Sequence, residues 1–288
     1  MSAVLGPGAS GVVVATPDQE AARRDRVWLE DAHIAAATID DLGLTLRQAS
    51  GALTGDFDER LFPAVQWAQV VRRPAILDLG EAVYVQGPET GIATERAEAL
   101  EAVESALAQR PPPRVAVFGG AWTAEDEPDY GSALTLGRGL AEALLEVVCG
   151  GYQGIMAAVC RGHTERHLGV TLGVTMEPWA EQVPVNQWLS HEVVARDLLA
   201  RLPLITDAEA WVAFPGGVGT LQEVALCWNL VQNGLADPRP LVVVGDRWKR
   251  LEDSFRDLLI VSDPAHLELV THVSTAEEAL VVVRKGLA

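Results

Sequence analysis

A short apolar run that enters a glycine-rich turn, with a helix directly after it, constrains this sequence more than any other feature. Residues 211–214 are apolar throughout, and Pro215 and the segment 216–220 follow them. Three glycines within four residues let the backbone turn sharply and lie close to a ligand. The first turn of the following helix offers free N–H groups and a partial positive charge. The layout predicts a phosphate-binding site made by Gly216, Gly217, Val218, Gly219 and Thr220.

Thr220 and Glu223 allow two interpretations. Thr-x-x-Glu at the start of a helix is the pattern of a capping box, in which the two side chains satisfy the first N–H groups of the helix. The same spacing places the Glu223 carboxylate at the mouth of the anion site. Spacing alone leaves both interpretations open.

Two further glycine clusters follow strand-like runs. Gly119 and Gly120 come after the apolar run 115–118, and the segment 149–154 lies between another such run and a helix. Loops that follow neighbouring strands can face one crevice, so both clusters are candidate walls of the ligand site. A simple tight turn explains Gly150 and Gly151 equally well.

Short apolar runs alternate with helical patterns from residue 114 to the end of the chain. This alternation predicts an α/β, Rossmann-like fold: a parallel sheet with helices on both faces, with its ligand at the carboxyl ends of the strands. The expected strands are 115–118, 169–174, 210–214, 241–245 and 272–273, and the expected helices are 132–148, 154–161, 186–202, 221–232 and 276–284.

Three consecutive prolines at 111–113 mark a boundary, because they cannot continue the preceding helical pattern. We therefore expect an N-terminal α/β region, 1–110, and a nucleotide-binding domain, 114–288. The first region is a small α/β unit or an extension of the main sheet, and no motif indicates its role. Its expected strands are 11–15, 74–79 and 82–86, and its expected helices are 28–39 and 94–109.

The charge and the apolar pattern exclude several classes of protein. The chain has 40 acidic and 22 basic residues, and its formal net charge of −18 repels the backbone of DNA or RNA. Neither a signal core nor the roughly 20 apolar residues of a membrane span is recognisable. We expect a cytoplasmic protein that binds neither nucleic acid nor membrane. The three cysteines lie in apolar stretches and are expected to be buried rather than paired in disulfides.

No metal or redox cofactor is expected. His163 and His167 are four residues apart, which fits two metal ligands on one helix face. No third ligand lies nearby in the sequence, so a solvated helix end explains this pair better.

Taken together, the glycine clusters resemble the Lonely Guy (LOG) family, which is often labelled lysine decarboxylase-like. The family motif PGGxGTxxE is complete from Pro215 to Glu223. The family segment GGGxxGLMGA is similar to residues 149–158, with Cys149 in place of its first glycine. The resemblance covers about residues 114–288.

The resemblance implies a nucleotide-binding protein that is commonly a homodimer. Several family members hydrolyse the N-glycosidic bond of a nucleoside 5′-monophosphate to free base and ribose 5-phosphate, and cytokinin nucleotides are their best-known substrates. It implies Glu223 as the catalytic carboxylate and an arginine from the preceding helix as its partner. The apolar content of the helix after the loop exceeds one core-facing stripe and also favours a dimer. The implied substrate-binding residues are Gly119, Gly120, Gly150, Gly151, Met156, Gly216, Gly217, Val218, Gly219 and Thr220.

The partner arginine is either Arg196 or Arg201. The two are five residues apart, about 140° around a helix, so both are not expected to face the ligand, and Arg201 has the better spacing to Pro215. The family often has Arg-Lys at this place, and the missing lysine leaves the base of the nucleotide open. A protein with the same site that binds a nucleotide or a nucleotide-like cofactor without turnover, as a sensor or carrier, is the alternative.

Overall fold

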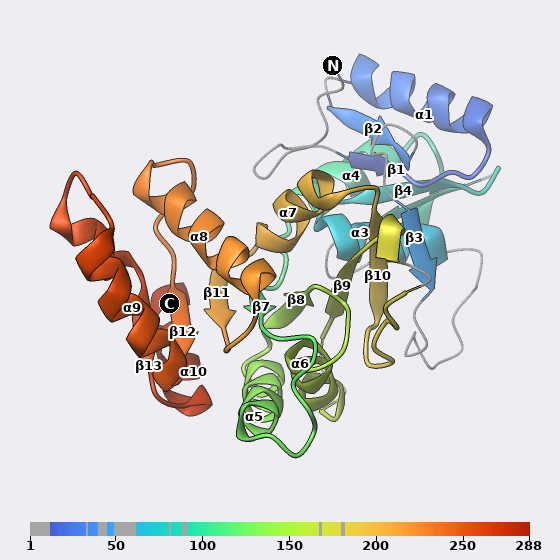
Figure 1. The fold of residues 1–288 in the computed structure, drawn as a ribbon. Coiled ribbons are helices and arrows are strands. Elements are labelled where there is room, and N and C mark those ends of the chain that lie inside the picture. The colour runs from blue at the N-terminus through green and yellow to red at the C-terminus, as the bar shows by residue number, and fades with distance from the viewer. Residues whose placement is uncertain are drawn as a thin grey trace. The chain divides into compact units, whose positions relative to one another are not determined.

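The structure is a computed structural model, and it describes residues 12–32, 34–39, 45–48, 62–80, 82–87, 91–166, 169–179 and 182–288. The chain divides into two compact units (Figure 1). One unit comprises residues 1–46 and 52–112, and the other comprises residues 47–51 and 113–288.

The first unit contains a five-stranded sheet with the order β2-β1-β4-β5-β6. Strand β1 pairs in parallel with β2 and β4, whereas β5 is antiparallel to both of its neighbours. Val13 packs in the cluster that contains α3, and Val12 and Val14 pack in the cluster that contains α1 and α4. The two faces of the sheet are therefore both covered. The elements are β1 (Val12–Val14), α1 (Gln19–Asp31), β2 (Ala36–Thr38), α3 (Phe62–Val71), β4 (Ala75–Asp78), β5 (Val83–Gln86), β6 (Gly91–Thr94) and α4 (Ala99–Leu107).

The second unit is built on an eight-stranded sheet with the order β13-β12-β11-β7-β8-β9-β10-β3. The seven strands from β13 to β10 all pair in parallel. The strands are β3 (Thr45–Gln48), β7 (Arg114–Phe118), β8 (Glu146–Cys149), β9 (Thr171–Met176), β10 (His191–Ala195), β11 (Ala210–Ala213), β12 (Leu241–Val244) and β13 (Thr271–Val273).

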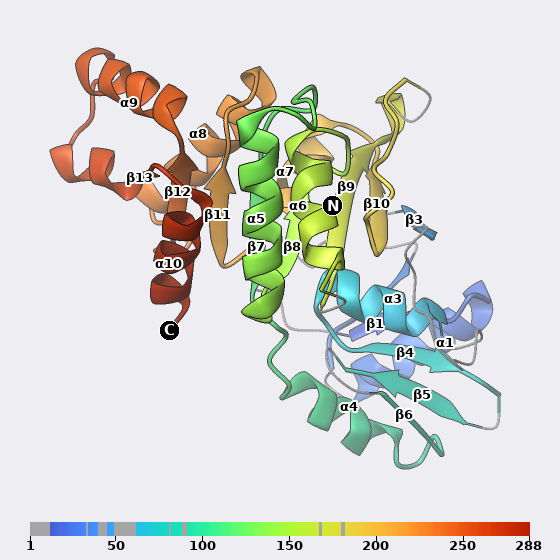
Figure 2. The same cartoon turned by 90° about the horizontal axis from the view of Figure 1, so that it is seen from below.

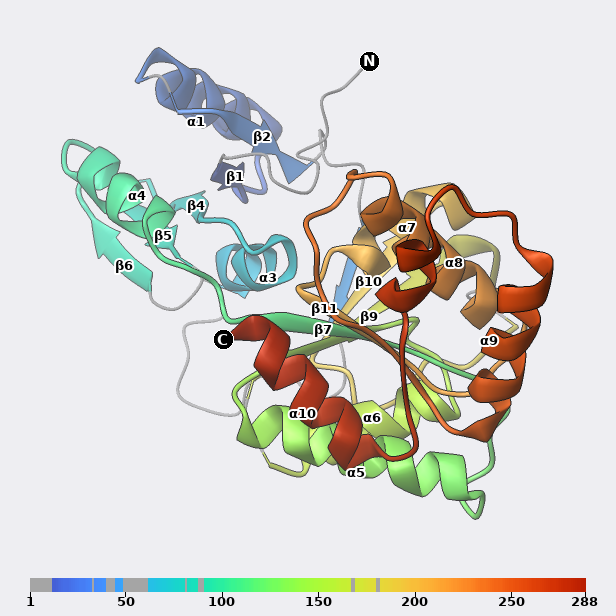
Figure 3. The same ribbon diagram turned by 90° about the vertical axis from the view of Figure 1, so that its left-hand side faces the viewer.

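Helices cover both faces of this parallel sheet, as Figure 2 and Figure 3 show. Helices α5 (Pro128–Glu142), α6 (Ile155–Thr164) and α10 (Ala276–Leu287) pack on one face in a continuous apolar cluster. Helices α7 (Leu198–Thr206), α8 (Val218–Gln232) and α9 (Asp246–Leu258) lie on the opposite face. Because both faces are covered, β7, β8, β11 and β12 are buried along their whole length, which explains their apolar sequences. The exceptions are Arg114 and Glu146, which form a buried ion pair of 2.7 Å. The expected Rossmann-like α/β architecture is confirmed.

Two expected helices are wrong in part. The helix expected over 132–148 ends at Glu142, Leu144 takes a left-handed φ of 57°, and β8 follows it. The helix expected over 186–202 is replaced by strand β10, and α7 begins after it at Leu198. Val147, Val148, Val193 and Val194 are β-branched and lie in the sheet, so tertiary packing outweighs the helical spacing of the residues around them.

The N-terminal expectations need a similar correction. The strands expected near 11–15, 74–79 and 82–86 are confirmed as β1, β4 and β5. The helix expected over 28–39 ends at Asp31 and is followed by β2. The helix expected over 94–109 is α4, which is shorter at both ends. Among the residues that the structure describes, no helix has both the length and the apolar character needed to cross a membrane.

Candidate functional site

A cleft of about 610 Å³ opens at the carboxyl ends of the parallel strands in the second unit. The loops after β7, β8, β9 and β11 contribute to it, together with the first turns of α5, α6, α8 and α9 and the side chains of Arg201 in α7 and Glu223 in α8. This is where a sheet of this topology is expected to place its ligand. Its lining includes Gly119, Gly120, Trp122, Tyr152, Met156, Trp179, Arg201, Pro215, Gly216, Gly217, Gly219, Thr220, Glu223 and Arg247.

The glycine-rich loop turns tightly between β11 and α8. A Cβ atom at Gly216 would overlap the Thr220 side chain and lie 2.9 Å from the Gly120 nitrogen, so the loop requires glycine there. The Gly120 N–H donates a hydrogen bond of 3.1 Å to the Pro215 carbonyl, which joins this loop to the loop after β7. Helix α8 begins at Val218 with Gly217 as its N-cap, so its first N–H groups face the cleft without a side-chain cap.

The capping-box interpretation of Thr220 and Glu223 is wrong. A capping box needs Thr220 at the N-cap, but Gly217 occupies that position and Thr220 lies inside the first turn. Both side chains are turned into the protein and line the cleft, where they are buried. Glu223 is therefore free of the helix terminus and available to a different partner.

That partner is Arg201. Its Nη1 lies 3.5 Å from Oε1 of Glu223, and its Nε donates a hydrogen bond of 2.7 Å to the Val174 carbonyl in β9. Asp197 caps α7 by accepting a hydrogen bond from the Ala200 N–H, which fixes the turn that carries Arg201. Two oppositely charged side chains from two helices thus meet at the floor of the cleft.

Burial sets the proton affinity of Glu223. Loss of solvent raises the pKa of the Glu223 carboxyl to about 7, and the positive charge of Arg201 offsets only part of that rise. A carboxyl group with this pKa exchanges its proton near neutral pH, as general acid–base chemistry requires.

Arg196 lies outside the cleft. Its side chain is 80% exposed and pairs with the adjacent Asp197 at 3.1 Å. It also precedes the N-cap of α7, so Arg196 and Arg201 do not share one helix and the angular argument for separating them does not apply. Of the two arginines, Arg201 is the one that lines the cleft.

The structure brings together most of the residues expected to bind substrate. All ten of them are in the described part of the chain, and seven line the cleft: Gly119, Gly120, Met156, Gly216, Gly217, Gly219 and Thr220. Gly150, Gly151 and Val218 do not line it, and Val218 is 84% exposed.

Gly150 packs against side chains that line the cleft, although neither Gly150 nor Gly151 lines it. A Cβ atom at Gly150 would overlap the Arg201 guanidinium and lie 2.7 Å from the Met156 sulfur. Gly151 has a φ of +80° and packs against Gly173, so it needs glycine for its conformation. This tight turn therefore restricts the position of the Arg201 side chain and does not itself line the cleft.

Several residues that line the cleft were not expected from the sequence. Trp122 and Trp179 line the cleft, and so do Tyr152 and Arg247. Trp122 lies two residues after the Gly119–Gly120 turn and Tyr152 directly after Gly151, which is a signal that the glycine clusters could have supplied. Trp179 and Arg247 lie near the ends of β9 and β12, where the strand order alone brings them to the site.

His163 and His167 were expected to lie at a solvated helix end. His163 is buried in α6 with Nε2 2.9 Å from the Leu145 carbonyl, and burial lowers its pKa, so a solvated helix end is the wrong interpretation. His167 lies outside the described residues.

The three cysteines are buried and free, as expected, and the Sγ atoms of Cys149 and Cys160 lie 3.5 Å apart.

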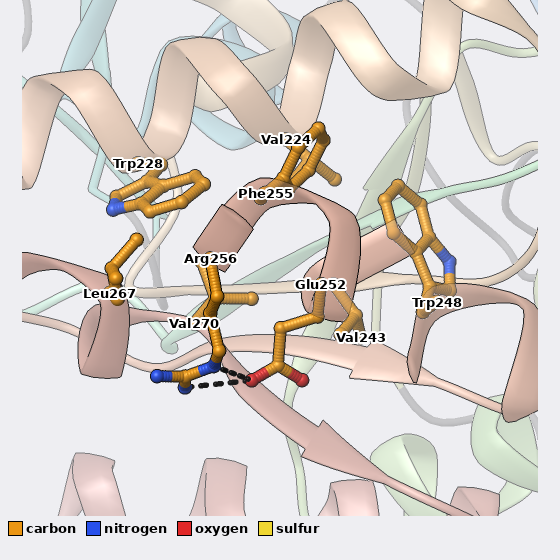
Figure 4. Close-up of a pocket in the computed structure, with 9 residues that line it drawn as sticks. All are labelled: Val224, Trp228, Val243, Trp248, Glu252, Phe255, Arg256, Leu267 and Val270. Atoms are coloured by element: carbon orange, nitrogen blue, oxygen red, sulfur yellow. Dashed lines mark hydrogen bonds and ion pairs between the residues drawn. The ribbon is translucent and has the colours of Figure 1, made fainter. Parts of the chain in front are cut away.

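A second cavity lies between α8, β12, α9 and the short helix η3 (Pro264–Leu269), and Figure 4 shows its side chains. Trp228, Phe255 and Val224 make its wall largely apolar, and Arg256 and Glu252 pair at its margin. Its volume of about 20 Å³ accommodates about one water molecule, so it is too small for a nucleotide.

A comparison with protein families finds a match in the second unit. A family model described as "Possible lysine decarboxylase" matches residues 156–283. The cytokinin riboside 5′-monophosphate phosphoribohydrolase of Rhodococcoides fascians is 29% identical over 188 residues, which are 64% of this chain and 89% of that protein.

One solved structure supports the same fold. The molybdenum cofactor binding protein of Rippkaea orientalis has a TM-score of 0.51 at 21% identity and covers 62% of this chain and 100% of its own. The molybdenum cofactor carrier protein of Chlamydomonas reinhardtii has a TM-score of 0.47 at 25% identity and covers 61% of this chain and 98% of its own. The first of these likenesses supports the architecture of the parallel sheet and its helices.

Proposed function

Because the chain belongs to the Lonely Guy (LOG) family, we propose that it hydrolyses the N-glycosidic bond of a nucleoside 5′-monophosphate to free base and ribose 5-phosphate. The observation that carries this proposal is the buried Arg201–Glu223 pair at the floor of a cleft that also contains a glycine-rich helix N-terminus. That the glycine-rich loop and the Glu223 carboxyl group line one cleft supports a reaction at the ribose of a nucleotide whose phosphate binds to the loop.

The phosphate binds to the loop 216–220. The N–H groups at the start of α8 and the partial positive charge of the helix terminus favour a dianion there. Arg247 lines the same end of the cleft and adds a full positive charge. Holding the phosphate fixes the position of the attached ribose, which lowers the entropy cost of the reaction.

Glu223 acts on the ribose. The bond between C1′ and the base nitrogen breaks with its electron pair moving to the base, and positive charge develops on the sugar. The ionised carboxylate of Glu223 stabilises that charge and accepts a proton from the water that adds to C1′, while the departing base takes up a proton. Arg201 orients the carboxylate through the 3.5 Å contact. The step balances without a metal ion or a redox cofactor.

A substrate panel tests this function. The full-length protein is incubated with AMP, GMP, CMP, UMP and a cytokinin riboside 5′-monophosphate, and free base and ribose 5-phosphate are separated by chromatography. We expect release from at least one nucleotide and much slower release from the matching nucleoside, which lacks the phosphate. Binding of nucleotides without product from any of them contradicts the hydrolase and identifies a sensor or carrier.

We also propose that the chain works as a cytoplasmic homodimer and does not bind nucleic acid. Leu221, Leu226, Leu230 and Val231 of α8 are only half-buried, which leaves apolar surface for a partner copy. The net charge of −18 opposes association with DNA or RNA. Light scattering at micromolar concentration should give twice the chain mass, and a monomer mass contradicts the dimer.

A further inference from the structure

Two free thiols lie in contact next to the candidate site. Cys149 is the last residue of β8 and stands where the family segment has its first glycine, and Cys160 lies in α6. Both residues are fully buried, and their sulfur atoms are 3.5 Å apart. The sulfur atoms of a disulfide bond lie about 2.05 Å apart, so an approach of about 1.5 Å joins the two side chains.

Cys149 is connected to the turn that restricts Arg201. Gly150 follows it directly, and a Cβ atom at Gly150 would overlap the Arg201 guanidinium. The Gly151 N–H donates a hydrogen bond of 3.4 Å to the Cys149 sulfur. A shift of this sulfur toward Cys160 therefore also moves the turn against which Arg201 packs.

Cys160 is connected to the same turn through α6. It lies four residues after Met156, on the same face of the helix. Met156 lines the cleft, and its sulfur would lie 2.7 Å from a Cβ atom at Gly150. Whichever of the two cysteines moves, the position of Arg201 changes, and with it the contact to Glu223.

The two thiols differ in their affinity for a proton. The hydrogen bond from the Cys160 thiol lowers the pKa of the Cys149 thiol against the effect of burial. The Gly151 N–H and the positive charge of Arg201 lower this pKa further, whereas the charge of Glu223 raises it. The same hydrogen bond and burial raise the pKa of the Cys160 thiol. Because the thiolate is the reactive form, Cys149 is the thiol that reacts first with an oxidant.

Burial restricts the oxidant to a small molecule. The side chains of Arg201 and Met156 pack on Gly150 and line the cleft, so one layer of side chains separates this turn from the cleft. Hydrogen peroxide has only two heavy atoms, and a brief local opening of this layer admits it.

From this arrangement we propose that Cys149 and Cys160 are a modification site, at which hydrogen peroxide forms a reversible disulfide bond that lowers turnover by displacing Arg201. The formation of the bond rests only on the two thiols. Its effect on turnover rests on the proposed function.

The chemistry balances with hydrogen peroxide as the only oxidant. The Cys149 thiolate attacks one oxygen and the O–O bond breaks, which gives a sulfenic acid and a hydroxide that takes up the proton lost by the thiol. The Cys160 sulfur then attacks the Cys149 sulfur, the S–O bond breaks, and a second water leaves with the Cys160 proton. Two thiols and one peroxide thus give one disulfide and two waters, and dithiothreitol reverses the modification by thiol–disulfide exchange.

Peptide mass tests the modification without reference to turnover. The full chain is exposed to increasing concentrations of hydrogen peroxide, denatured, and treated with N-ethylmaleimide, which labels every free thiol. Trypsin then releases residues 139–161 as one peptide that holds both cysteines and Met156. Oxidation of Met156 to its sulfoxide marks a dose that reaches the cleft. Cys227→Ser is the matched control, because Cys227 is equally buried but lies in α8.

We expect the peptide to lose two hydrogen atoms and to carry no maleimide, at or below the dose that oxidises Met156. Dithiothreitol should restore both labels, Cys227→Ser should form the same disulfide, and Cys160→Ser should not form it. Two maleimide labels on the wild-type peptide after Met156 is oxidised, or oxygen added to Cys149 in place of the bond, overturn the inference.

Turnover of the best substrate of the panel tests the consequence of the bond. Peroxide-treated wild type and Cys227→Ser should be slower than their reduced forms by about tenfold or more, and dithiothreitol should restore the rate. The rate of Cys160→Ser should be the same before and after treatment. Dithiothreitol does not reduce methionine sulfoxide, so recovery separates the disulfide from oxidation of Met156.

Two results contradict the effect on turnover, and they differ in meaning. A disulfide that forms without loss of turnover, or an equal loss in Cys160→Ser, overturns the displacement of Arg201 and leaves the proposed function standing. Absence of turnover from reduced wild type on every nucleotide contradicts the proposed function, while the peptide mass still decides whether the disulfide forms.

Discussion

Nη1 of Arg201 lies 3.5 Å from Oε1 of Glu223, and the two residues are only 6% and 8% exposed. They come from different helices, α7 and α8, and both line the cleft. A buried carboxylate beside one arginine keeps its charge only through that partner, so the chemistry of Glu223 depends on Arg201.

Removal of Arg201 should disable the site, whereas removal of Arg196 should not. Arg201→Ala leaves Glu223 buried without its cation, and we expect turnover to fall about 100-fold or more. Arg196→Ala removes an exposed side chain outside the cleft and is the matched control. Steady-state kinetics on both variants check this, and equal activity of the two would show that Arg201 has no special role.

The turn at Gly150 should be required for the position of Arg201. A Cβ atom there overlaps the guanidinium, so Gly150→Ala should displace Arg201 and reduce turnover by about tenfold or more. Gly131→Ala in α5 is the control, because a Cβ at Gly131 meets no atom within 4 Å. Circular dichroism identifies temperatures at which both variants are folded, and the kinetics are compared at those temperatures. Wild-type turnover in Gly150→Ala would contradict the packing argument.

Gly216 should be required for the phosphate site. In Gly216→Ala the new methyl group overlaps Thr220 and forces the loop to shift, so the affinity for ribose 5-phosphate should fall about tenfold or more. Calorimetric titration measures this loss, again with Gly131→Ala as the control. An unchanged affinity would place the phosphate away from the loop.

The raised pKa of Glu223 should be visible in stability. Its value of about 7 in the folded protein exceeds the ordinary 4.5, so between these pH values the folded chain binds more protons than the unfolded chain. The free energy of unfolding contributed by this group therefore falls as pH rises from 4.5 to 7.

Glu223→Gln removes this titration. The stability of the variant relative to wild type should increase between pH 4.5 and 7.5, by on the order of 2 kcal/mol. Urea denaturation of both proteins at each pH gives the difference, in which the shared titrations of all other groups cancel. A difference that does not change with pH would mean that Glu223 ionises normally.

The parts of the fold that the sequence predicted are those in which local and tertiary preferences agree. The run 211–214 is apolar because β11 is buried on both faces, and Gly216 after it is required by close packing, so pattern and structure coincide. Helix α9 shows the opposite case. Its surface is charged and its i,i+4 pairs, such as Lys249 with Asp253, are local, yet no motif marked it as a helix.

The site itself could be predicted only in part. Gly216 to Glu223 are contiguous, so their pattern and family resemblance identified them. Residues such as Trp122 and Trp179 lie far apart in the sequence and meet at one cleft because β7 and β9 are neighbours of β8 in the sheet. The order of the strands in the sheet is a property of the whole fold. The spacing of residues within one motif does not determine it.

The most direct test of the account is the rate of ribose 5-phosphate formation from the best substrate of the panel, measured for wild type and Glu223→Gln beside their affinities for the same nucleotide. Glutamine keeps the shape of the side chain and removes its charge. The account predicts that affinity changes little while the rate falls about 100-fold or more, the scale of losing a positioned catalytic group. An unchanged rate in Glu223→Gln would contradict the catalytic role of Glu223.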